Sequence, residues 1–171
     1  NLMSALNDDD KWFRLRAAEA IVRIDGTKYE NVKTALHESL KEEENLLRLI
    51  AANTIAELGS RARDSEPALM EALNDPSFGY YAHVILALGA IMADSDRTIN
   101  TLISLMESEE YRFWAAVALG ELAPASKAAI PALIEALRAE DMYTRSGAAA
   151  ALGKFGPAAG DAVEGLLRAT K

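Results

Sequence analysis

Few residues in this sequence have the types and spacing needed for chemistry. The His37-Glu38 pair could contribute to a metal site, and the only other histidine is His83. A metal centre needs three or four converging ligands, so one pair does not predict it. The sequence also has no Gly-x-Ser-x-Gly turn, no phosphate-binding glycine-rich loop with a lysine, and no histidine near a plausible nucleophile. We therefore expect no enzyme activity, no catalytic or metal-binding residues and no cofactor.

Composition narrows the classes of partner. The 171 residues include no cysteine, which excludes disulfides and thiol chemistry, and half of them are hydrophobic, enough for a sizeable core. A net charge of −8 disfavours nucleic acid and anionic lipid surfaces and makes a basic partner easier to bind. No apolar run approaches the roughly 18 residues that cross a bilayer. We expect a monomeric module that binds a protein or peptide.

The elements that would position a site repeat every 31–34 residues. The segment LMSALND at 2–8 recurs at 69–75 as LMEALND. One equivalent position holds Arg14, Arg48, Tyr81, Arg112 and Arg145. Seven residues further on lie Ile21, Ile55, Leu88, Leu119 and Leu152, and three beyond those lie Ile24, Leu58, Ile91, Leu122 and Phe155. This spacing is that of an amphipathic helix, and it predicts an all-α chain of helical hairpins.

Helix-breaking residues mark the limits of the repeats. Gly59, Pro124 and the Gly156-Pro157 pair fall between successive copies. We divide the chain into a partial repeat at 1–26, repeats at 27–60, 61–93, 94–125 and 126–158, and a partial repeat at 159–171. The last repeat has no second helix, and the polar caps that close a solenoid are not visible. We therefore expect a single module of a larger protein.

Each copy resembles a HEAT repeat, because an arginine near the start of the second helix is followed by an Ala-Ala run and a Leu-Gly pair. The phycobilisome-lyase-like subclass is the most similar, with AAAALGKFGPAA at 148–159 as the best-matched copy. Tyr81 replaces the arginine in one copy, and Val22 and Ala56 replace the small glycine in two others. The resemblance implies a right-handed α-α superhelix, an armadillo-like solenoid of about five hairpins.

Two series of charged residues have structural interpretations. The arginines lie on the inward face of their helices, so we expect an inter-repeat ladder of hydrogen bonds. The candidate partners are Asp10, Glu44, Glu110 and Asp141. Acidic clusters precede the second helices, where carboxylates cap free N–H groups; stacked repeats would also align these clusters into an acidic edge for a basic partner.

A candidate binding surface follows from the helical geometry. Phe13, Tyr80 and Tyr111 share an apolar position that we expect in the core. Positions 12, 16 and 19 project away from the arginine, toward the side that lines the concave groove in HEAT-like arrays. The partner-binding residues predicted there are Trp12, Arg16, Ile50, His83, Leu86, Trp114, Val117 and Tyr143. Such apolar residues are unexpected on a solvated face and indicate either a partner or a covering domain.

Two functions fit this surface. The first is a non-catalytic scaffold that presents its concave face to a protein or peptide. The alternative is a HEAT domain appended to an enzyme, such as a bacterial sulfatase-type hydrolase, which it orients or shields. An adjoining domain of the same chain would then be the partner.

Overall fold

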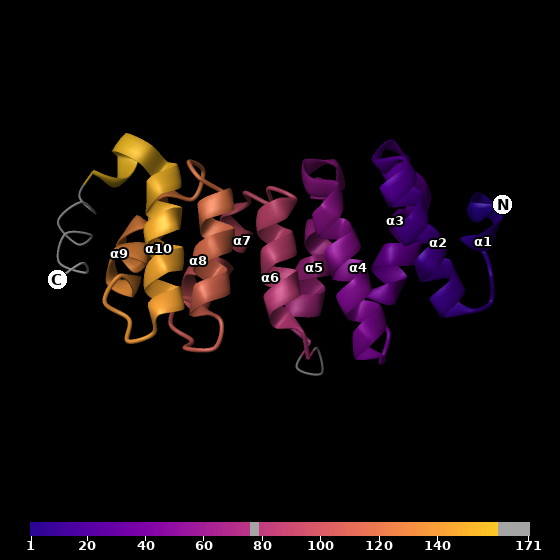
Figure 1. The fold of residues 1–171 in the computed structure, drawn as a ribbon, viewed down its shortest axis with the longest axis horizontal. Helices are drawn as coiled ribbons and strands as arrows, with labels where there is room; N and C mark the ends of the chain where they lie inside the picture. The colour runs from indigo at the N-terminus through magenta and orange to yellow at the C-terminus, as the bar shows by residue number, and fades with distance from the viewer. Residues whose placement is uncertain (76–78, 161–171) are drawn as a thin grey trace. The chain divides into compact units, whose positions relative to one another are not determined.

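A computed structural model describes residues 1–75 and 79–160, and all the regular secondary structure within them is helical. The chain forms two compact units, one comprising Asn1–Ile91 and the other starting at Met92. Figure 1 shows the helices of both units. No helix within the described ranges combines the length and the apolar character that a membrane span needs.

The first unit contains three successive hairpins of antiparallel helices. They pair α1 (Leu2–Ala5) with α2 (Lys11–Ile24), α3 (Tyr29–Ser39) with α4 (Asn45–Leu58), and α5 (Glu66–Leu73) with α6 (Tyr81–Ala90). The 3-10 turns Gly26–Lys28 and Gly59–Ser65 connect one hairpin to the next. The second helices form a continuous layer, because α4 packs against both α2 and α6 (Figure 1).

The second unit repeats this arrangement. Helix α7 (Asp96–Leu105) pairs with α8 (Arg112–Glu121), and α9 (Ile130–Ala136) pairs with α10 (Met142–Phe155). The 3-10 turn Lys127–Ala129 leads into α9, and Gly156–Ala159 follows α10. Helices α8 and α10 lie side by side along their lengths (Figure 1).

The helix ends follow from local hydrogen bonding. The Asp10 carboxylate accepts from the first backbone N–H groups of α2, and the Asp141 carboxylate accepts from the backbone N–H of Thr144 in α10. Glu44 precedes α4 but makes no capping hydrogen bond. Helix capping therefore accounts for only some of the acidic clusters that precede the second helices. At the other end, Gly59 and Gly156 terminate α4 and α10 with φ of 57° and 56°, a conformation that favours glycine.

The core matches the predicted apolar stripe, with one exception. Every residue of both apolar series is buried except Ile24, which is 75% exposed at the last position of α2. The expectation of a buried ring at the Phe13 position is wrong, because Phe13 is 53% exposed and Tyr80 is also exposed. The equivalent Leu47 and Thr144 are buried. The position therefore buries leucine or threonine, whereas the rings at this position are exposed in Phe13 and Tyr80 and half-buried in Tyr111.

Candidate functional site

One side-chain donor recurs at the same place in all five described hairpins. Each donates to the backbone carbonyl six residues earlier, one to three residues after the first helix ends, where carbonyls lack a partner within the helix. The pairs are Arg14 with Asp8 (2.9 Å), Arg48 with Glu42, Tyr81 with Asp75 (2.6 Å), Arg112 with Met106 (2.7 Å) and Arg145 with Ala139 (2.8 Å). The tyrosine hydroxyl thus makes the same hydrogen bond as the arginines.

This arrangement corrects the predicted inter-repeat ladder. The hydrogen bonds join the two helices of one hairpin, and three of the four carboxylates proposed as partners have other roles. Asp10 and Asp141 are helix caps, while Glu44 lies 2.7 Å from the ammonium of Lys11. Arg48 also reaches the next hairpin, where its guanidinium lies 3.4 Å from the Asp75 carboxylate. The arginine series is therefore part of the scaffold, and the candidate site lies elsewhere.

The outer surface of the second helices in the first unit is largely polar. Arg16 is exposed and pairs with Glu19 at 2.6 Å on its own helix, α2. Across neighbouring helices, the indole N–H of Trp12 donates to Glu44 at 2.9 Å, and a ring nitrogen of His83 lies 2.9 Å from the side-chain oxygen of Asn53.

Ile50 on α4 and Leu86 on α6 are half-buried. The five predicted residues of this unit, Trp12, Arg16, Ile50, His83 and Leu86, therefore lie on adjacent second helices.

Ion pairs also connect the start of α2 to the residues that precede α4. Lys11 lies 2.7 Å from Glu44 and 3.2 Å from Glu42, and the hydrogen bond to Glu44 is the main cause of a raised pKa at Lys11. The same hydrogen bond lowers the pKa of Glu44. This part of the surface therefore already satisfies its charges internally.

The corresponding surface of the second unit is apolar, and it contains the other three predicted residues. Trp114 and Val117 are half-buried on α8, and Tyr143 on α10 is 67% exposed. Phe113 joins the aromatic residues, since its ring centroid lies 4.7 Å from that of Trp114 and 6.5 Å from that of Tyr143. We call Phe113, Trp114, Val117 and Tyr143 the aromatic surface.

Small residues on α10 leave the aromatic surface uncovered. A Cβ at Gly147 would lie 2.9 Å from the Phe113 ring, so only glycine fits here without displacing that ring. Ala150, one turn further along, is exposed and too short to cover its neighbours. The ion pair of Lys154 with Glu121, at 2.6 Å, connects the two helices near their far ends. Sequence spacing placed Trp114 and Val117 on one face, but the participation of Phe113 depends on the glycine opposite it.

The His37-Glu38 pair has a different environment from a metal site. The Nε2 atom of His37 lies 2.8 Å from the Ser65 hydroxyl, which also lies 2.6 Å from the hydroxyl of Tyr29. This network links α3 to the turn that precedes α5. Residues 1–75 and 79–160 contain no group of three or more side chains arranged to hold a metal ion.

We expect His37 to make stability depend on pH. Burial, followed by the charge of Lys33, lowers the pKa of His37 below its ordinary value, so the unfolded chain binds a proton more readily than the folded chain. Stability should therefore fall as the pH drops below about 6.5, the ordinary pKa of histidine. Urea titrations of the wild type and His37→Gln between pH 7.5 and 5 would measure this. An unchanged slope in the variant would assign the pH dependence to other groups.

The stacked hairpins, with one donor repeated in each, define an α-solenoid, a class built by stacking a single supersecondary unit. The family model described as HEAT repeats matches residues 32–120 and 99–171, and the chain belongs to this family. A crystal structure of an engineered protein is similar in fold, with 21% identity and a TM-score of 0.62 over 98% of this chain and 86% of that chain. The comparison with curated proteins found no match.

Proposed function

We propose that this chain is a non-catalytic scaffold and that the aromatic surface of its second unit binds a protein or peptide. HEAT repeats generally serve as protein-interaction scaffolds. The observation that carries the proposal is the 67% exposure of Tyr143 beside the half-buried Trp114 and Val117. Apolar surface left open to water favours association, and Trp and Tyr are among the residues that contribute most to protein interfaces.

The geometry supports a partner that inserts between the large side chains. Trp114 and Tyr143 come from adjacent helices, and the ring of Phe113, which lies against Gly147 of α10, is close to both of them. A partner side chain that packs on Phe113 would have the Trp114 and Tyr143 rings on either side, with centroids 4.7 Å and 6.5 Å from that of Phe113. In the first unit, the predicted residues Trp12, Arg16, Ile50, His83 and Leu86 form a face of their own, with polar and apolar side chains on adjacent second helices.

The test is to replace Trp114 and Tyr143 with alanine one at a time. A photo-crosslinking amino acid at position 143 would identify the partner, and titration calorimetry would then measure its affinity. We expect Trp114→Ala and Tyr143→Ala each to weaken binding at least tenfold, which corresponds to roughly 1.4 kcal/mol. Circular dichroism should show unchanged helical content, because neither residue is buried.

The matched control is Phe13→Ala, which removes an exposed aromatic residue from the first unit, outside the candidate surface. It should bind like the wild type. Equal losses in Phe13→Ala and Trp114→Ala would point to general hydrophobic association and contradict the assigned surface. Unfolding of Trp114→Ala together with unimpaired binding by Tyr143→Ala would assign these rings to the core.

The same apolar character also suits a permanent interface with an adjoining domain of the same chain. In that case the module would be a HEAT domain appended to an enzyme such as a bacterial sulfatase-type hydrolase. The alanine-rich copy at 148–159 supports the finer assignment to the phycobilisome-lyase-like subclass. A hydrolase sequence adjoining the module in its full-length protein, with crosslinks from position 143 to that domain, would favour this alternative.

A further inference from the structure

Equivalent grooves occur between first helices in the two units. One lies between α3 and α5 and has a volume of about 240 Å³, and the other lies between α7 and α9 and has a volume of about 390 Å³. We call the first the closed groove, because ion pairs cross it, and the second the open groove; the closed groove shares Lys41, Ala68 and Glu71 with a further hollow of about 370 Å³. Both are at the ends of the first helices, beside the carbonyl-binding arginines Arg48 and Arg112.

Two ion pairs bridge the closed groove. The ammonium of Lys41 lies 2.8 Å from the Glu71 carboxylate of the following hairpin. The guanidinium of Arg48, already bonded to a carbonyl, lies 3.4 Å from the Asp75 carboxylate. The protein's own side chains thus supply one ammonium and one carboxylate to this groove.

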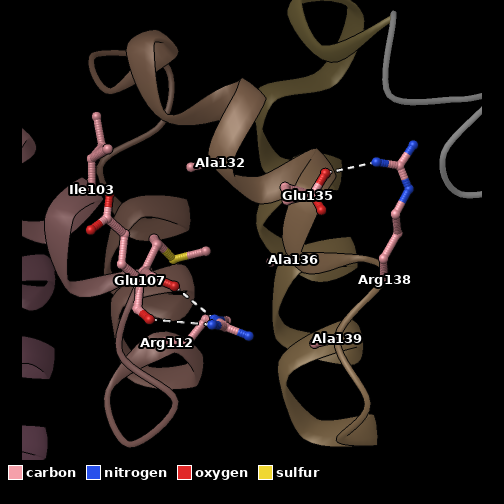
Figure 2. Close-up of a pocket in the computed structure, with 9 residues that line it drawn as sticks. Ile103, Glu107, Arg112, Ala132, Glu135, Ala136, Arg138 and Ala139 are labelled. Atoms are coloured by element: carbon pink, nitrogen blue, oxygen red, sulfur yellow. Dashed lines mark hydrogen bonds and ion pairs between the residues drawn. The ribbon is translucent and has the colours of Figure 1, made fainter.

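Neither bridge exists in the open groove, because one partner of each pair differs. Glu107 occupies the position of Lys41, so the groove is lined by two residues of like charge, Glu107 and Glu135, the counterpart of Glu71. Ala139 occupies the position of Asp75, so no carboxylate of the following hairpin pairs with Arg112 among the described residues. Figure 2 shows Glu107 and Arg112 on one side of the groove and Glu135 on the other.

The remaining groups of the open groove are available to a ligand. Arg112 donates to the carbonyls of Met106 and Glu107, which uses two of the five N–H donors of its guanidinium. Glu135 bonds to Arg138 on its own side of the groove, but both side chains are exposed and such pairs are weak (Figure 2). The apolar part of the lining comes from Ile103, Met106, Ala132 and Ala136. The groove between α1 and α3 has polar Asn31 and Thr34 in its lining instead.

We propose that the open groove binds a peptide segment of mixed charge, with a lysine ammonium facing Glu107 and Glu135 and a carboxylate on Arg112. This occupant supplies the two charges that Lys41 and Asp75 supply in the closed groove. The aliphatic part of the segment packs on Met106 and Ala132. A charge-assisted hydrogen bond from a guanidinium to a carboxylate is stronger than one between neutral groups, which favours this orientation. The site is separate from the aromatic surface.

Blocked peptides provide the probe. We would titrate acetylated, amidated peptides that carry one lysine and one aspartate separated by one, two or three alanines, and follow the backbone amides of Ala132, Ala136 and Ala139 by NMR. At least one spacing should shift these resonances saturably. Replacing its aspartate with asparagine, or its lysine with norleucine, should weaken binding at least tenfold. Equal binding by the singly charged peptides, or no shifts with any spacing at millimolar concentration, would overturn the proposal.

A variant that has both ion pairs of the closed groove distinguishes a loss of peptide binding from a loss of folding. Glu107→Lys with Ala139→Asp restores both bridging pairs and should abolish the shifts while melting at or above the wild-type temperature. Should the double variant fail to fold, each single change restores one bridge and should weaken binding at least tenfold. Trp114→Ala serves as the control and should bind the peptide normally, because the aromatic surface is a different site. Retained binding in the folded double variant would refute the site.

Discussion

Arg48→Ala is expected to lower the free energy of unfolding by about 2–4 kcal/mol, the largest loss among the arginine substitutions. The Arg48 side chain is only 4% exposed, and it connects the Glu42 carbonyl of its own hairpin to the Asp75 carboxylate of the next. Its removal leaves the Glu42 carbonyl, in the connection after α3, without this donor and removes the packing of a long aliphatic stem. The loss therefore combines an unsatisfied polar group with a cavity.

Urea denaturation monitored by circular dichroism would measure this loss. Arg61→Ala is the matched control, since Arg61 is exposed, and its effect should stay within about 0.5 kcal/mol. Arg48→Lys should give an intermediate loss, because an ammonium cannot reproduce the planar fork that serves both acceptors. A loss for Arg48→Ala no larger than that for Arg61→Ala would mean that water satisfies the Glu42 carbonyl at no cost.

The periodic features of the fold were predictable because each depends on one type of side chain that recurs at a regular spacing. Ile55, Leu88 and Leu119 recur with the repeat and are all buried, which fixes the inward face of each second helix. The acceptors of the arginines were not predictable in this way. Every helix end exposes backbone carbonyls, whatever its sequence. A prediction based on side-chain types therefore considers only carboxylates as acceptors for the arginines. Tyr81 replaces the arginine in its copy, and the residue type alone does not indicate that its hydroxyl reaches the equivalent carbonyl.

The candidate sites were predictable only in part, for a related reason. The helical projection placed Trp114 and Val117 on one face. The openness of that face depends on contacts between helices, such as the approach of Phe113 to Gly147. The open groove depends on residue pairs about 30 positions apart, since Glu107 is unremarkable until it is compared with Lys41 and its partner Glu71. Such pairings become visible only when the hairpins are stacked.

Gly120→Val is the second substitution with a large expected effect, a loss of about 2–3 kcal/mol in the free energy of unfolding. A Cβ at Gly120 would lie 2.9 Å from both the Cα and the Cβ of Ala151, so α8 and α10 would have to move apart. The contact between these helices is more extensive than that between α2 and α4, where Val22 occupies the equivalent position. Glycine therefore sets the close approach within the second unit.

The matched control is Gly153→Val, at the equivalent position of the next helix. No described atom lies within 4 Å of a Cβ placed there, and valine has the higher helix propensity, so the change should be neutral or stabilising by up to about 0.5 kcal/mol. Urea denaturation of both variants isolates the packing effect from the propensity effect, which the two substitutions share. Similar stabilities for the two variants would show that α8 and α10 separate at little cost. In that case the position of Phe113 against α10, and with it the aromatic surface, would not depend on this close packing.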